Sequence, residues 1–444
     1  MASTYLTRTS TSGSRRIGTF SAWVKRGSLT TLNTLLDCYT SFEQNWFNIR
    51  FSAGDQIQAI GYDYTTGSFQ EQFELRPSRL FRDTNAWYHI VFSWDSTQAT
   101  ESNRLKFYVN GVQETSFARS VYPSQNEDFY INYNSIPYWI GRGGWNSNYF
   151  NGSMSHVHII DGTAYDASAF GSTDSTTGEW KINTSPSVTY GTNGAFILKD
   201  GNSVTDQSGN SNNFTVGAGT LTKTEDNPSN VFCTMNPLSP CIGGTYTFEN
   251  GNTTCQQDIS RGTLSTLGMN SGKFYAEAKF ISTSGSDCLI GIVGINQKAN
   301  EAPSIQATGY VYDQDGNKRN NNSGSSFGNT YTTGDIIGIA VDLDNNKIYF
   351  SKNGTWQNSG DPTSGSTGTG AAYTITAASS TPDGFYYFTH CDINTTNKVS
   401  WNFGNGYFGT TAVSSAGTNA SGNGIFEYDV PTGYTALSTK GLNL

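Results

Sequence analysis

Apolar and polar residues alternate with a period of two along much of this chain, and this pattern constrains the fold more than any other feature. Clear examples lie at residues 19–25, 87–94 and 105–109. Because successive side chains of a β-strand point to opposite faces, such alternation predicts strands with one buried face. No segment longer than about ten residues has the apolar spacing of an amphipathic helix. The sequence therefore predicts an all-β protein of antiparallel sheets.

Tight turns are predicted where glycine and asparagine separate two alternating segments. Asn110-Gly111 divides residues 105–113, and residues 334–356 contain three strand-like segments separated by turns at 344–346 and 353–354. Asparagine and glycine tolerate the positive φ angles of the turns that match strand twist. These segments are therefore expected to form hairpins.

The chain is longer than one hydrophobic core usually supports, so two modules are expected. The chain has 444 residues. A proline-marked segment at 224–240 contains Pro228, Pro237 and Pro240. Proline favours turns and connections over strand interiors. We therefore expect two tandem β-sandwiches at residues 1–223 and 241–444, joined by residues 224–240.

Charge and hydropathy exclude several classes of partner. The net charge is -9 and only 14% of residues are charged, so the basic face that nucleic acid requires is not expected. The first residues have no apolar core of a signal peptide, and the apolar segment at 336–341 is far too short to span a membrane. Six scattered cysteines without a repeated spacing are expected to be reduced thiols.

Residues 17 to about 165 resemble the laminin-G and concanavalin-like jelly-roll family. The motifs that carry the resemblance lie, in order, at residues 20–25, 87–91, 105–111, 140–141 and 150–154. Residues 271–437 resemble the SPRY family through the segments 271–275, 334–356 and 428–437. The resemblance implies a jelly roll followed by a SPRY β-sandwich.

The two modules and the segment 227–238 together resemble virion proteins of tailed bacteriophages, especially marine ones. The resemblance implies a protein displayed on the particle as a tail appendage, tail fibre component, capsid fibre or knob, or capsid decoration. It also implies a homo-oligomer that is assembled in the host cytoplasm without a signal peptide. Its partners would be other virion proteins and a host-surface glycan or receptor. The alternatives are a lectin-like bacterial adhesin and a jelly-roll enzyme that degrades polysaccharides through an unrecognised carboxylate pair.

A glycoside hydrolase needs two carboxylates a short distance apart. Glu71 and Glu74 have an odd spacing, which would place them on opposite faces of a strand. Asp161 with Asp166, and Asp342 with Asp344, lie beside turns, where aspartate bonds to the local backbone. Structural roles are therefore expected for all six, and neither a catalytic residue nor an enzyme activity is predicted.

Metal binding rests on two sets of residues. His156 and His158 are spaced to share one strand face, but no acidic or thiol residue beside them completes a site, so a packed pair is expected. Calcium is the cofactor that laminin-G-like jelly rolls often bind, and the candidate ligands are Asp83, Asp95 and Asp161. No other cofactor is predicted.

The candidate binding residues of the first module combine flat rings with amides, the chemistry that stacks on sugars and bonds their hydroxyl groups. In the first module they are Trp145, Asn146 and Tyr149. By resemblance, one end of the SPRY sandwich binds partners through its loops. There the candidates are residues 320–326 together with Tyr310, Tyr312, Asp313 and Asp315.

Overall fold

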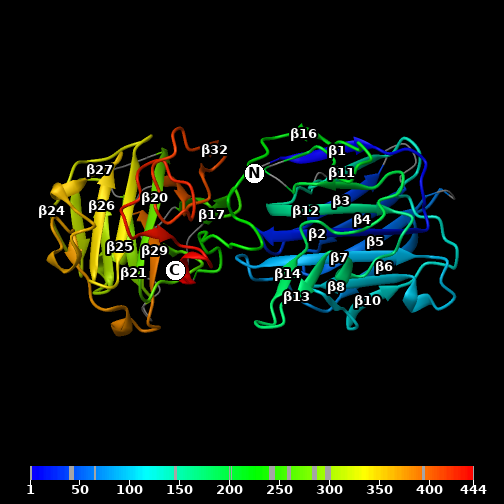
Figure 1. The fold of residues 1–444 in the computed structure, drawn as a ribbon, viewed down its shortest axis with the longest axis horizontal. Helices are drawn as coiled ribbons and strands as arrows, with labels where there is room; N and C mark the ends of the chain where they lie inside the picture. Colours follow the sequence, from blue (N-terminus) through cyan, green and yellow to red (C-terminus); the bar gives the residue numbers. More distant parts are fainter. Residues whose placement is uncertain are drawn as a thin grey trace. The chain divides into compact units, whose positions relative to one another are not determined.

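The computed structural model describes residues 3–39, 45–64, 67–144, 148–199, 201, 203–239, 246–257, 262–282, 288–295, 302–392 and 396–443. The chain forms two compact units, Met1–Lys223 and Thr224–Leu444. Strands dominate both units (Figure 1), which confirms the predicted all-β class. Within the described residues, no helix is long and apolar enough to cross a membrane.

The first unit is a sandwich of two antiparallel sheets. One sheet has eight strands in the order β10-β6-β5-β4-β3-β11-β1-β16, the other has six in the order β15-β12-β2-β7-β8-β9, and β13 pairs with β14 as a separate hairpin. The strands are β1 (Tyr5–Thr9), β2 (Ile17–Arg26), β3 (Asn33–Tyr39), β4 (Trp46–Phe51), β5 (Ile57–Asp63), β6 (Gln70–Pro77), β7 (Trp87–Asp95), β8 (Leu105–Val109), β9 (Val112–Gln113), β10 (Phe117–Val121), β11 (Pro137–Ile140), β12 (Gly152–Asp161), β13 (Gly171–Thr173), β14 (Trp180–Ile182), β15 (Ala195–Ile197) and β16 (Thr215–Ala218).

The core of the first unit lies between its two large sheets, because each contributes one face of alternating apolar residues. Phe20, Ala22 and Val24 of β2 face Phe47 and Ile49 of β4 in one buried cluster. Two short 3-10 helices, η1 (Glu101–Asn103) and η2 (Ala167–Ala169), lie in the connections. The apolar residues of the alternating segments thus form the interior of the sandwich.

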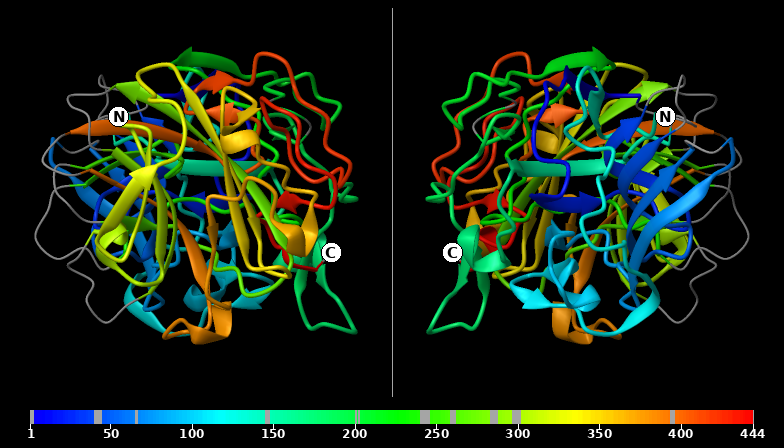
Figure 2. Two further views of the ribbon diagram at one scale, coloured as in Figure 1. Left: turned by 90° about the vertical axis from the view of Figure 1, so that its left-hand side faces the viewer. Right: turned by 90° about the vertical axis from the view of Figure 1, so that its right-hand side faces the viewer.

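The predicted hairpin at Asn110-Gly111 is confirmed. Asn110 and Gly111 have φ angles of 48° and 82°, and Val109 pairs with Val112 across the turn. The ring of Trp180 lies so close to Gly111 that an added Cβ would be 2.3 Å from it. Trp180 belongs to the hairpin β13–β14, which projects from the first unit (Figures 1 and 2).

The second unit is another sandwich. Its larger sheet contains β17-β18-β30-β20-β25-β26-β27, with β28 beside β26 and β33 parallel to β20, and its smaller sheet has the order β19-β29-β21-β22-β23-β24; β31 pairs with β32. The strands are β17 (Tyr246–Glu249), β18 (Thr254–Gln257), β19 (Gly262–Leu264), β20 (Lys273–Ser282), β21 (Cys288–Gly294), β22 (Gly309–Asp313), β23 (Asn317–Asn320), β24 (Ser323–Ser326), β25 (Ile336–Asp342), β26 (Lys347–Lys352), β27 (Thr355–Trp356), β28 (Tyr373–Thr374), β29 (Tyr386–Asp392), β30 (Asn397–Asn402), β31 (Tyr407–Phe408), β32 (Thr411–Ala412) and β33 (Thr435–Ala436). Its 3-10 helices are η3 (Pro303–Ile305), η4 (Gln357–Ser359), η5 (Gly365–Thr367), η6 (Ala378–Ser380) and η7 (Gly441–Asn443).

Residues 224–239, which the sequence presents as part of the joint, lie in the second unit. Cys233 and Met235 are buried in its main core, and the Cys233 NH donates to the Leu437 carbonyl at 3.0 Å. The segment packs in this way because apolar side chains lie between its prolines. Pro240 is outside the described residues.

The described cysteines, at positions 38, 233, 255, 288 and 391, are buried and form no disulfide. Burial raises the pKa of the Cys38, Cys255 and Cys288 thiols well above its usual value. A buried thiol with a raised pKa is a packing residue rather than a nucleophile. This agrees with the expectation of reduced thiols for the part of the chain that is described, and Cys241 lies outside it.

Candidate functional site

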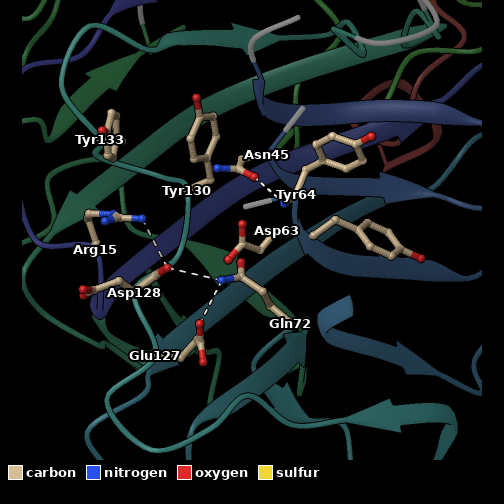
Figure 3. A pocket seen from close by; sticks show the side chains of 10 residues that line it. Arg15, Asn45, Asp63, Tyr64, Gln72, Glu127, Asp128, Tyr130 and Tyr133 are labelled. Atoms are coloured by element: carbon tan, nitrogen blue, oxygen red, sulfur yellow. Dashed lines mark hydrogen bonds between the residues drawn. The ribbon is translucent and has the colours of Figure 1, made fainter. Parts of the chain in front are cut away.

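A polar cavity of about 590 Å³ opens in the first unit where β5 ends and β6 begins (Figure 3). This volume lies within the range of about 300–1,000 Å³ that is usual for small-molecule sites. The described residues that line it are four tyrosines and a set of polar or charged side chains: Tyr62, Tyr64, Tyr130, Tyr133, Arg15, Asn45, Asp63, Gln72, Glu127 and Asp128. We call this cavity the tyrosine pocket.

One wall of the tyrosine pocket is a loop between β10 and β11. Phe129 and Ile131 of this loop are fully buried in the core and fix its position. Tyr130 and Tyr133 project beside them and stack, with ring centroids 5.6 Å apart and an interplanar angle of 20°. The loop thus presents a rigid aromatic wall.

Arg15 holds this wall in place. Its Nε donates to the Phe129 carbonyl at 2.7 Å, and its guanidinium carbon lies 4.9 Å from the centre of the Tyr133 ring. Tyr133 is 37% exposed whereas Tyr130 is 2% exposed. An exposed ring stacked on a buried one is available to a ligand without first being ordered.

The polar side chains of the tyrosine pocket come from the ends of β5 and β6 and from the same loop. Gln72 Nε2 donates to Glu127 Oε1 at 2.9 Å, and the Tyr64 NH donates to Asn45 Oδ1 at 2.6 Å. In Figure 3, Asp63 and Gln72 lie between the Tyr133 side of the cavity and the Tyr64 side. Carboxylates and amides in this position can bond the hydroxyl groups of a ligand.

Gln72 reaches the pocket because of a β-bulge. Tyr62 pairs with Glu71 and Gly61 pairs with Phe73, so Gln72 is an extra residue in β6. A bulge re-aims the side chain of the unpaired residue. The sequence pattern contained no signal for it.

The same bulge overturns the prediction that Glu71 and Glu74 lie on opposite faces. Their partners in β5 are Tyr62 and Ile60, which are two residues apart and share a face, so the two glutamates share it as well. Arg119 bridges them, with its NH2 2.6 Å from Glu71 and its Nε 2.8 Å from Glu74. The two carboxylates are held as ion-pair partners on the outer face of the sheet.

An aromatic platform adjoins the tyrosine pocket on this outer face. Trp46 of β4 stacks on Tyr62 with ring centroids 5.9 Å apart and an interplanar angle of 17°. Phe69, which is 49% exposed, lies 4.9 Å from Tyr64 and 6.1 Å from Tyr62 between ring centres. The guanidinium carbon of Arg50 lies over the Trp46 ring, 5.0 Å from the ring centre. We refer to Trp46, Tyr62 and Phe69 as the platform.

Asp37 supports the platform from below. It accepts hydrogen bonds from Trp46 Nε1 and from the Gly144 NH, both at 2.7 Å. Burial raises the pKa of Asp37 to about 7 despite these bonds. The sequence did not identify Asp37, because an aspartate in a strand becomes recognisable only when its donors, one of them more than a hundred residues away, are in place.

Of the three candidate residues at 145–149, Tyr149 lies within the described part of the chain. Tyr149 is half-buried, and its backbone pairs with that of Arg142 in an isolated antiparallel β-bridge. The Arg142 guanidinium lies over the rings of Tyr5 and Trp139, at 4.9 and 5.1 Å from their centres. Trp145 and Asn146 lie outside the described residues. Tyr149 does not line the tyrosine pocket.

In the second unit, the prediction that Tyr310 and Tyr312 belong to a binding loop is wrong. Both lie in β22 and are buried in the core, with exposures of 4% and 0%. Residues two apart in a strand share a face, and here this face is the interior one. Asp313 is also buried and is paired with Arg319, and burial raises its pKa to about 6. Asp315 is exposed at the following turn, where Arg319 contacts it at 2.8 Å.

The candidate calcium ligands are occupied by other parts of the chain. Asp161 accepts from the NH groups of Ser14 and Asn193 at 2.7 and 3.0 Å. Asp95 accepts from the Thr97 NH and Asp83 from the Asn85 NH, which are local turn contacts. Among the described residues, no group of three or more His, Cys, Asp or Glu side chains could hold a metal ion.

The remaining carboxylate candidates also have structural partners. Asp166 caps η2 by accepting from the Ser168 NH, Asp342 contacts Lys273 at 3.0 Å, and Asp344 accepts from the Gly272 NH. His156 and His158 are buried against Phe196, and His158 Nδ1 lies 3.0 Å from the Tyr190 hydroxyl. Burial lowers the pKa of His158 well below its ordinary value.

Comparison with known families agrees with these two sandwiches. Residues 2–169 match a laminin-G family model that is described as the concanavalin A-like lectin/glucanases superfamily, and residues 273–405 match the SPRY domain. The chain therefore contains a laminin-G-like, concanavalin-like domain followed by a SPRY domain.

Among individual proteins, the chain is 34% identical over 86 residues to the Ran-binding proteins 9/10 homolog of Drosophila melanogaster and 36% identical over 87 residues to Ran-binding protein 9 of Danio rerio. Each match covers 19% of this chain, and 9% and 14% of those relatives, respectively. Solved structures with similarity include the SPRY domain of human HERC1, with a TM-score of 0.29 and 16% identity over 38% of this chain and 96% of that one. Another is a SAP-like pentraxin from Limulus polyphemus, with a TM-score of 0.27 and 15% identity over 36% of this chain and 71% of that one.

Proposed function

We propose that the first unit binds carbohydrate in the tyrosine pocket. The observation that carries the proposal is that the stacked pair Tyr130 and Tyr133 lines the same cavity of about 590 Å³ as Asp63 and Gln72. A sugar ring has an apolar face that packs on an aromatic ring and hydroxyl groups that bond to carboxylates and amides. The pocket offers both kinds of contact within the space of a small ligand.

Glycan-array binding of the full chain, followed by calorimetric titration of the best ligand, tests this proposal. Tyr133→Ala should weaken binding by about tenfold or more, because it removes the exposed stacking ring, a loss of about 1.4 kcal/mol or more. Phe385→Ala is the matched control, since this aromatic residue of the second unit has a similar exposure of 36%. Unchanged affinity in Tyr133→Ala would exclude the tyrosine pocket as the site.

The proposed activity is binding without cleavage. Glu71 and Glu74 share a face, but both are held by Arg119, and Glu74 also accepts from Gln58 at 2.8 Å. A glycosidase needs one carboxyl group placed to protonate the leaving oxygen and a second placed on the sugar or its water. Incubation with the bound glycan should release no new reducing ends, and their appearance would support the alternative of a polysaccharide-degrading enzyme.

We further propose that the protein is displayed on a bacteriophage particle, as a tail appendage, a capsid fibre or knob, or a decoration. The support is the sequence resemblance of the tandem jelly roll and SPRY domain to tailed-phage virion proteins. In this arrangement the first unit would bind a host-surface glycan and the second would contact another virion protein. Mass spectrometry and immunogold labelling of purified particles should detect the protein. Its absence from particles and presence on bacterial cells would favour the adhesin alternative.

The proposed partner role of the SPRY domain draws on its relatives, which are named as Ran-binding proteins. Exposed residues available for contact are Asp315 and the strand β24. Cross-linking mass spectrometry on intact particles should place links between the second unit and a capsid or tail protein. A homo-oligomer is also proposed, and sedimentation at the mass of a single 48.2 kDa chain would contradict it.

A further inference from the structure

The carboxylates of the tyrosine pocket outnumber its cations. Asp63, Glu127 and Asp128 line it, and of the described lining residues only Arg15 is basic. The Arg15 guanidinium already donates to the Phe129 and Asp128 carbonyls, and the Asp128 carboxylate is paired with Arg16 at 2.8 Å. The carboxylates of Asp63 and Glu127 therefore carry the negative charge that faces a ligand. A ligand with a negative charge would therefore meet like charges, and like-charge contacts at a binding surface are strongly unfavourable.

The tyrosine pocket and the platform meet at Tyr62. Tyr62 lines the pocket and at the same time stacks on Trp46, so the two surfaces share a residue. Cross-strand register places Tyr62 directly opposite Trp46 on the neighbouring strand. Adjacent strands lie about 4.8 Å apart, so the rings follow one another across the sheet. Phe69 extends the same aromatic surface beside Tyr62 and Tyr64.

Sugars in a chain can use such a surface through their apolar faces alone. The ring-centre separations along it are 5.9 Å from Trp46 to Tyr62 and 6.1 Å from Tyr62 to Phe69. Trp46 is nearly parallel to Tyr62, whereas Phe69 is nearly perpendicular to it, with interplanar angles of 17° and 82°. Each ring buries a large apolar area when it is covered, so a ligand that reaches more rings gains more contact. A single sugar in the pocket would leave the platform unused, whereas a longer chain would cover it.

We propose that the ligand is an extended glycan without acidic groups, with one end in the tyrosine pocket and the following sugars on Trp46, Tyr62 and Phe69. The proposal rests on carbohydrate binding by the pocket and adds the ligand's charge and length. Polymers that carry uronate or sulfate groups are disfavoured by the carboxylates of Asp63 and Glu127.

The first experiment compares charge. On an array with neutral, amino-bearing, uronate and sulfated glycans, the full chain should bind members of the first two classes. The best neutral ligand and its C6-carboxylated derivative are then titrated, and carboxylation should weaken binding by about tenfold or more, equivalent to about 1.4 kcal/mol. Glu127→Gln should reduce this difference because it removes one negative charge while keeping the shape of the side chain.

The second experiment compares length. For the same neutral ligand, affinity should rise from the disaccharide to the hexasaccharide. Phe69→Ala should reduce the affinity of the hexasaccharide by a larger factor than that of the disaccharide. Phe69 is suited to this test because it is half exposed and is not a member of the buried core. Trp46→Phe is a second variant that keeps a ring on the platform and should retain most of the length dependence.

The outcomes separate this inference from the proposed function. Binding that depends on Tyr133 but is equal or stronger for carboxylated glycans, or is independent of chain length, would overturn the inference and leave carbohydrate binding intact. Failure to bind any glycan class would overturn both.

Discussion

Arg26 and Asp55 form an ion pair in which neither side chain is exposed to solvent. The Arg26 NH2 lies 3.1 Å from Asp55 Oδ1, and the exposures of the two side chains are 0% and 1%. The guanidinium also lies 4.5 Å from the centre of the Phe51 ring. Burial lowers the pKa of Arg26 from its usual value, and Asp55 partly offsets this effect. The pair joins the end of β2 to the turn before β5.

Asp55→Ala should destabilise the first unit by about 3–5 kcal/mol, because it leaves a buried guanidinium without its counter-charge. Urea unfolding at neutral pH measures the change. Asp174→Asn is the control, since it removes one partner of the exposed pair between Lys181 and Asp174, and it should leave the unfolding midpoint nearly unchanged. An equal effect of the two substitutions would contradict the special cost of the buried pair.

Gly111→Ala should destabilise the protein more than Gly178→Ala. Both glycines have positive φ angles, 82° and 73°, which cost an alanine about 1 kcal/mol. Around Gly178 there is open space, whereas a Cβ at Gly111 would be 2.3 Å from the Trp180 ring. Displacing that ring should add about 1–3 kcal/mol. Thermal unfolding of the two variants gives the difference, and equal losses would show that Trp180 moves freely.

His89 should make the first unit less stable as the pH falls below about 6.5. It is buried between Ser21, at 2.9 Å from Nε2, and Trp180, whose Nε1 donates to Nδ1 at 3.0 Å. Burial lowers the pKa of His89 to about 3. Between pH 3 and 6.5 the unfolded chain therefore binds a proton that the folded chain does not, and stability falls by about 1.4 kcal/mol per pH unit on acidification.

The measurement is the difference in unfolding free energy between pH 5 and pH 7 for the natural protein and for His89→Gln. The substitution should reduce the loss of stability at pH 5, since glutamine does not titrate. The same substitution at another buried imidazole, His390→Gln in the second unit, should leave the acid response of the first unit unchanged. An identical pH response of the first unit in His89→Gln would contradict the prediction.

Glu277 connects β20 to the C-terminal part of the second unit. Its carboxylate accepts from the NH groups of Glu427 and Tyr428, both at 2.9 Å, and burial raises its pKa to about 7. Between about pH 4.5 and 7 the folded chain holds a proton that the unfolded chain releases, so this group's contribution to stability falls as the pH rises through that window.

Glu277→Gln should remove this pH dependence and should also present an amide NH2 to backbone donors, at a cost of about 1–3 kcal/mol. Hydrogen exchange at Glu427 and Tyr428 should accelerate. Glu249→Gln, which removes the partner of Lys398 at 2.6 Å, is the control and should leave these two amides protected. Unchanged exchange in Glu277→Gln would show that the carboxylate does not hold the segment.

Local sequence determined the elements whose geometry depends on a few neighbouring residues. Alternation at 19–25 and 87–94 predicts β2 and β7, and both strands form. The turns at Asn110-Gly111 and Asn353-Gly354 form with positive φ angles, because glycine and asparagine accept them wherever they occur in the chain. The resemblance to the two domain families rests on the same local motifs.

Tertiary structure alone determined that the tyrosine pocket forms and whether the predicted binding residues are exposed or buried. Arg15, Tyr62, Gln72 and Tyr133 come from four separate segments, and their meeting depends on the order of strands in the sheet. The bulge at Gln72 depends on pairing with β5, and it reverses which face Glu74 occupies relative to Glu71.

The exposure of the binding residues proposed from sequence in the second unit also could not be predicted from the sequence. Alternation shows that Tyr310 and Tyr312 share a face, but it does not show whether that face is covered. The larger sheet of the second unit covers this face, so both rings lie in the core. Strand formation depends on neighbours in the chain, whereas burial and the approach of distant side chains depend on which strands the sheets bring together.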